Sequence, residues 1–234
     1  MKKFIILSFA AALMAILPAF TTCDVLIFFK AGSSITMTSY DNDGKITGST
    51  KTDFVTVTKT DSGTVVNAKN ESFDKKGKSS STNNYSLRCN KNILYIDIKS
   101  MVPAEHAESL KNMEMSMSGA DLEIPMTLTV GSTLKDGDMT FSFKSTDGSP
   151  MPPINMNIKV TNRKVIAKET VTTPAGTFEC YKITEDGQIK NSMFTSKYKV
   201  ISWFSYEAGN VKTESYKENG KFMSKTELTA LKKG

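Results

Sequence analysis

The chain has 234 residues, of which 39% are hydrophobic, so it is long enough for one β-rich domain or two small ones. Its net charge of +6 is small and is spread over many lysines, which favours solubility over nucleic-acid binding. The sequence holds one histidine, His106, which argues against Ser/His or Cys/His catalytic pairs and against zinc sites built on several histidines.

The first 22 residues are typical of a secretory signal peptide. A charged start at Lys2 and Lys3 precedes an apolar run over 4–17, and Pro18 closes it. That run is shorter than the ~20 residues of a membrane-spanning helix, and no later stretch predicts a transmembrane helix. We predict cleavage after Thr21 or Thr22. The mature chain, 23–234, is then a single β-rich domain exported to the periplasm or the outer envelope.

Cys23 leaves a second localisation open. In a lipoprotein the first mature residue is a lipidated cysteine, and one acyl chain would tether a soluble domain to a membrane. Phe20, Thr21 and Thr22 depart from the small residues that usually precede such a cysteine. Lipidation of Cys23 is therefore the alternative to a soluble exported protein.

The cysteines predict one disulfide and one free thiol. All three lie in the mature part, and an exported protein meets an oxidising environment. Cys180 lies in the middle of a predicted strand behind Phe178, whereas Cys23 and Cys89 lie near strand ends, where disulfide geometry is easier to meet. We predict that Cys23 and Cys89 are bonded and that Cys180 is reduced and buried.

Most of the mature sequence alternates between apolar and polar residues, which is typical of strands with one solvent-exposed face. Tight turns rich in Asp, Asn, Lys and Gly separate these runs. A short helix is predicted over 103–111, where Pro103 stands at a plausible first position. The clearest strands are 34–38, 54–58, 93–98, 139–143 and 154–158, and the clearest turns are 41–45, 74–78, 172–178 and 217–221.

These elements predict a mainly β fold. The order of strands and turns indicates an antiparallel meander that forms a curved half-barrel or two packed sheets, with one short helix.

Met113, Met115 and Met117 form an unusual comb of thioethers at alternate positions. The spacing places all three on one face of a strand. Soft sulfur ligands select Cu(I), but flexible methionines more often form an adaptable apolar surface. We predict that the three bind an apolar ligand or a partner and coordinate no metal.

Four segments carry a resemblance to known proteins: Arg163-Lys164-Val165, 169–180, Trp203 and 211–216. They resemble the TapB-like family of exported proteins, a domain of unknown function. Near Trp203 the chain departs from the family pattern, because similar proteins read Trp-Tyr followed by a Gly-Val-Gly type of turn, whereas here 204–210 follows the Trp. The resemblance implies an exported β fold and no catalytic residue. Further matching positions are Cys23, Tyr40-Asp41, Gly44-Lys45, Arg88-Cys89, 122–125, Gly131 and 134–137.

Three functions remain open. The first is a non-enzymatic envelope protein that binds an apolar or lipid-like ligand in the hollow of a curved sheet, without a cofactor. The second is a structural or partner-binding module of the cell envelope. The third and least favoured is a hydrolase that uses carboxylates such as Asp97, Glu114 and Glu123. The sequence leaves the ligand, the partner and the oligomeric state open.

Overall fold

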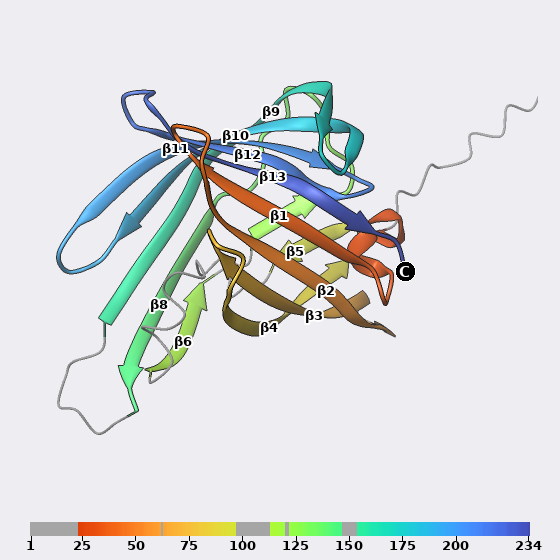
Figure 1. The fold of residues 1–234 in the computed structure, drawn as a ribbon, viewed down its shortest axis with the longest axis horizontal. Helices are drawn as coiled ribbons and strands as arrows, with labels where there is room; N and C mark the ends of the chain where they lie inside the picture. Colours follow the sequence, from red (N-terminus) through yellow and green to blue (C-terminus); the bar gives the residue numbers. More distant parts are fainter. Residues whose placement is uncertain (1–22, 62, 97–112, 120–121, 147–153) are drawn as a thin grey trace, which may run out of the picture.

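The computed structural model describes residues 23–61, 63–96, 113–119, 122–146 and 154–234 (Figure 1). Within these residues thirteen strands form one antiparallel sheet, which is strongly curved and open. This confirms the predicted mainly β meander in its half-barrel form. The predicted helix over 103–111 and the signal peptide lie outside the described residues. The elements are η1 Cys23–Val25, η2 Ile27–Phe29, β1 Ser34–Asp41, β2 Ile46–Thr60, β3 Gly63–Asp74, β4 Ser79–Asn90, β5 Ile93–Ile96, β6 Met113–Gly119, β7 Leu122–Pro125, β8 Gly137–Ser145, β9 Ile154–Thr173, β10 Gly176–Lys190, β11 Thr195–Ser205, β12 Gly209–Lys217 and β13 Phe222–Lys232.

The strand order places the first and last strands side by side. It reads β6-β8-β9-β10-β11-β12-β13-β1-β2-β3-β4-β5-β7, so β1 pairs with β13 in the middle of the sheet, and β6 and β7 form its two edges. Most neighbours in the sheet are also neighbours in sequence, joined by hairpin turns. This is why local alternation and turn chemistry predicted the architecture well.

The predicted turns are confirmed where β1 joins β2, β3 joins β4, β9 joins β10 and β12 joins β13. In the first, Gly44 has a φ of +78°, and the backbone N–H groups of Asp43 and Lys45 both donate to the Asp41 carboxylate at 2.9 Å. A left-handed conformation costs glycine little, and an aspartate before it supplies the acceptor that closes the turn.

One face of the sheet, which we call the inner face, carries the main core. It includes Phe54, Val66, Val211 and Leu228, none more than 1% exposed. Residues of a strand alternate between faces, so the pairing register traces the inner face across the sheet. The alternate residues define the outer face.

The segment 23–29 packs against the inner face as a plug. Leu26 and Ile27 are fully buried, and the ring of Phe28 lies 5.1 Å from that of Phe54. The backbone N–H of Ile27 donates to the carbonyl of Glu207 at 2.9 Å. The apolar run Leu26 to Phe29 of this segment is thus placed inside the half-barrel.

The predicted disulfide is present between Cys23 and Cys89, with a Cα–Cα distance of 6.2 Å that lies in the usual range for a bridge. It ties the plug to β4. Cys180 is free and buried, as predicted. Burial, reinforced by the nearby Glu169 carboxylate, raises the pKa of the Cys180 thiol to about 12.

The connection between β7 and β8 joins the two halves of the sheet at the plug end. We call β6 and β8 to β12 one wing, and β13, β1 to β5 and β7 the other wing. The Met126 N–H donates to the carbonyl of Asn92 at 2.8 Å, and the Leu134 N–H donates to the carbonyl of Arg163 at 2.9 Å. Met126, Leu128 and Leu134 are buried. The inner face is therefore covered at this end, although the sheet itself stays open.

Arg163 reinforces the same junction from inside. Its side chain is 2% exposed, and its guanidinium donates to the carbonyls of Glu123 (3.0 Å) and Lys135 (2.6 Å) and to the carboxylate of Glu185 (3.3 Å). Burial raises the pKa of Glu185 more than the charge and hydrogen bond of Arg163 lower it. A charged side chain can be buried when its N–H groups find acceptors, and these three oxygens supply acceptors for the Arg163 guanidinium.

Candidate functional site

A second apolar cluster lies on the inner face, apart from the main core. It consists of Leu122, Val160 and three side chains of β8, Met139, Phe141 and Phe143. Its partly buried neighbours on β9 are Met156 and Ile158. The next residue of the same row, Ile154, is 39% exposed. These side chains form an apolar strip along β8 and β9, which ends at the partly exposed Ile154.

Met113, Met115 and Met117 belong to β6, the edge strand beside this strip. The register pairs Met115 with Phe143 and Met117 with Phe141, so their backbone positions are directly opposite two aromatic residues of the cluster. The three are on one strand, as predicted. Their side chains lie outside the described part of the chain, and their role as a binding surface stays a prediction.

The inner face of β13, β1, β2 and β3 is rich in hydroxyl groups. The hydroxyls of Ser39 and Thr226 are 3.1 Å apart, and Thr52 donates to the amide oxygen of Asn70 at 2.5 Å. A cavity of about 620 Å³ adjoins these strands and includes Ser39, Thr50, Phe73, Ser224 and Thr226 in its lining. The inner face therefore combines an apolar strip with a hydroxyl-lined hollow.

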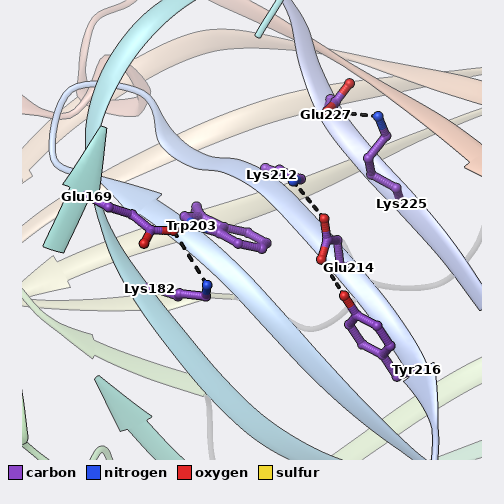
Figure 2. Close-up of polar contacts among 8 residues, drawn as sticks. All are labelled: Glu169, Lys182, Trp203, Lys212, Glu214, Tyr216, Lys225 and Glu227. Atoms are coloured by element: carbon purple, nitrogen blue, oxygen red, sulfur yellow. Dashed lines mark hydrogen bonds and ion pairs between the residues drawn. The ribbon is translucent and has the colours of Figure 1, made fainter. Parts of the chain in front are cut away.

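The outer face of β9 to β13 carries a ladder of charged residues around Trp203 (Figure 2). Lys182 and Lys212 pair with Trp203 from the two neighbouring strands, and their ammonium groups lie 5.0 and 4.5 Å from the ring centroid. The indole N–H donates to the carboxylate of Glu169 at 2.5 Å. Trp203 is only 5% exposed, because it belongs to the main buried cluster as well as contacting the two lysines and Glu169.

The ladder continues toward β13 through Glu214. This carboxylate receives Lys212 at 2.6 Å and the Tyr216 hydroxyl at 2.5 Å. Burial alone would raise the pKa of Glu214, but the hydrogen bonds from Lys212 and Tyr216 give a net lowering. The same bond to Glu214 raises the pKa of Tyr216 to about 12. Lys225 and Glu227 add a further pair at 2.9 Å.

The described residues offer little for catalysis. Among them no group of three or more His, Cys, Asp or Glu side chains could hold a metal ion. Glu123, one of the carboxylates considered for a hydrolase, is engaged by Lys135 at 2.6 Å. Asp97 and His106 lie outside the described residues, as does the side chain of Glu114.

No helix in the described part of the chain is long and apolar enough to cross a membrane.

The chain belongs to the DUF3108-like family, whose sequence pattern matches residues 30–228. The narrower TapB-like name is not confirmed by this match. No curated protein matches the chain.

Two crystal structures share the fold. One is of a Bacteroides fragilis protein inferred to be exported and described as having a YmcC-like fold; it is 24% identical, with a TM-score of 0.70 over 87% of this chain and 97% of the other. The second is of a Parabacteroides distasonis protein inferred to be a lipoprotein, 21% identical, with a TM-score of 0.71 over 88% and 98% of the two chains. At these identities the likeness is one of fold.

Sequence reasoning missed the charged ladder and the buried arginine. The sequence draws attention to Trp203 only through the family resemblance, which says nothing about its charged neighbours. The alternation Lys212-Thr213-Glu214 indicates that two charged side chains lie on the same face of a strand. Their partners in the ladder come from four other strands, which local alternation does not reveal.

Proposed function

We propose that this protein is a non-enzymatic exported envelope protein that binds an apolar or lipid-like ligand on the inner face of its curved sheet. The observation that carries the proposal is the apolar strip of β8 and β9, which lies apart from the main core and reaches the exposed Ile154. Concave apolar surfaces with a few polar groups are typical of small-molecule sites.

The ligand best suited to this surface is amphipathic. The strip would receive the acyl portion, because Phe supplies a large apolar area and Met adapts to irregular apolar shapes. The hydroxyl-lined hollow at Ser39 and Thr226 would receive the polar end through hydrogen bonds. The three methionines of β6 extend the strip in this proposal and hold no metal.

Native mass spectrometry of protein purified from its own envelope tests this function. We expect a co-purifying lipid, and its loss when Met113, Met115 and Met117 are all replaced by Ser. Met223→Ser is the matched control, because Met223 is 41% exposed on β13, away from the strip. Stoichiometric Cu(I) in the parent that the triple variant loses would overturn the proposal. So would a triple variant that loses only stability, because the methionines would then be core residues.

A partner-binding module is the second candidate, and the charged ladder is the observation that favours it. The ladder presents Tyr216 and partly exposed charged pairs, and protein interfaces use such aromatic and charged residues. However, the charges of the ladder already pair with one another, which leaves fewer groups for a partner. Lys182→Glu with Lys212→Glu should abolish envelope cross-links under this candidate and leave lipid binding unchanged.

A further inference from the structure

The tip of the hairpin between β10 and β11 displays two large apolar side chains. Met193 is 83% exposed and Phe194 is 51% exposed. Among the described residues Met193 is the most exposed large hydrophobic side chain. Figure 1 shows this hairpin reaching out at the end of the molecule opposite the C-terminus. Two adjacent large apolar side chains at one exposed turn form a small apolar patch, which is typical of a site that meets a membrane or a partner.

A closed turn holds the two side chains outward. The Asn191 side-chain oxygen accepts from the backbone N–H groups of Met193 and Phe194, both at 2.8 Å. The Asn191 N–H donates to the carbonyl of Phe194 at 3.0 Å. The turn satisfies its own backbone groups and places Met193 and Phe194 at the apex.

The hairpin is also basic. Its outer part, 187–199, includes Lys190, Lys197 and Lys199 and no Asp or Glu, and Lys199 lies 3.9 Å from Asp186. Lys190 and Lys197 flank the tip on its two strands, and both are exposed. Lys197 lies 3.5 Å from Glu218, but both side chains are more than half exposed, so this pair is weak and can open.

We propose that the tip of this hairpin docks on a membrane surface that carries anionic lipids. Met193 and Phe194 enter the boundary between headgroups and acyl chains, and Lys190 and Lys197 lie at the level of the lipid phosphates. An apolar tip with a cationic collar is complementary to such a surface in both polarity and charge. The inference goes beyond the proposed function, because the tip is separate from the inner face. It also supplies an attachment that does not need an acyl chain on Cys23, which the disulfide occupies.

Co-sedimentation of the purified protein with vesicles tests the proposal. The vesicles are phosphatidylcholine with or without phosphatidylglycerol, at low and high salt. We expect binding to the anionic vesicles at low salt, weakened about a hundredfold by Met193→Ser with Phe194→Ser through the loss of apolar burial. Lys190→Gln with Lys197→Gln should weaken it about tenfold, because each lysine near such a surface adds attraction.

Matched variants distinguish the tip from general surface effects. Met223→Ser removes another exposed methionine, and Lys75→Gln with Lys76→Gln removes two lysines from the exposed turn after β3; neither should change vesicle binding. In Phe194→Trp the new indole should shift its emission to the blue on vesicles, whereas Trp203 is buried in both states.

The proposal is overturned by an absence of binding to anionic vesicles, or by binding that the tip variants leave intact. It is also overturned if the tip variants convert a dimer to a monomer in size-exclusion chromatography, since the occupant is then a second copy. Lipid carried on the inner face is read separately by native mass spectrometry, so either proposal can fail alone.

Discussion

Gly209 and the ring of Phe28 are in direct contact, and a methyl group at Gly209 would overlap the ring. Gly209 opens β12 with a φ of +73°, and Phe28 is part of the plug. The missing side chain at Gly209 thus allows the plug to seat against the sheet.

Gly209→Ala should therefore lower the free energy of unfolding by about 2–5 kcal/mol, from the left-handed backbone and from displacement of Phe28. Gly44→Ala is the control, because Gly44 has a similar φ of +78° with no atom near the added methyl group. It should cost only about 1–2 kcal/mol. Urea unfolding of both variants measures the difference. Equal costs would show that Phe28 yields freely and that the plug is loosely seated.

The Cys23–Cys89 bridge closes a loop of 66 residues and should contribute up to about 4 kcal/mol through the entropy of the unfolded chain. Cys89→Ser should remove this contribution, and adding Cys23→Ser should cost little more, because the same bridge is already lost. Peptide mapping without reductant identifies the bonded pair. Cys180 in the bridge, or a lipid on Cys23, would contradict the assignment.

Cys180 should resist alkylation in the folded protein. With a pKa of about 12, roughly one thiol in ten thousand is ionised at pH 8, and the side chain is fully buried. Iodoacetamide should label no cysteine in native protein, and one per chain in denaturant without reductant. After reduction in denaturant, all three should react. Rapid native labelling would show that β9 and β10 open locally around Cys180.

The sequence predicted the elements that depend on neighbouring residues. Alternation placed β1, β2, β5, β8 and β9, and an aspartate before Gly44 specified the first turn, because both signals act within a few residues. The same local logic identified Cys180 as buried, since Phe178 and Cys180 share one strand face.

Contacts between distant residues could not be predicted in the same way. Arg163 stands in the polar run Asn162-Arg163-Lys164, which resembles an exposed basic stretch. It is buried because a carbonyl 40 residues earlier and a carboxylate 22 residues later converge on it. Only the curvature of the whole sheet brings those groups together. The Trp203 ladder depends on cross-strand register for the same reason.

Glu185 should make the protein less stable as the pH rises. Burial holds the pKa of this carboxyl above its ordinary value despite the adjacent Arg163, so the folded state binds a proton that the unfolded state has already released. The contribution of Glu185 to stability is then fully present below the ordinary glutamate value. It is lost as the pH rises through the raised pKa of the folded state.

Comparison with Glu185→Gln isolates this effect, because the amide still accepts from Arg163 but does not ionise. The difference in unfolding free energy, wild type minus variant, should fall with pH from about 4.5 upward and level off above the raised pKa. Asp74→Asn is the control of opposite sign: backbone N–H groups of Lys78 and Lys76 lower the pKa of Asp74, so its contribution is lost as the pH falls. A difference that instead rises with pH would mean that Arg163 keeps Glu185 ionised in the folded state. The junction of the two wings would then rest on a buried ion pair, and Arg163→Met would cost about 3–5 kcal/mol at every pH.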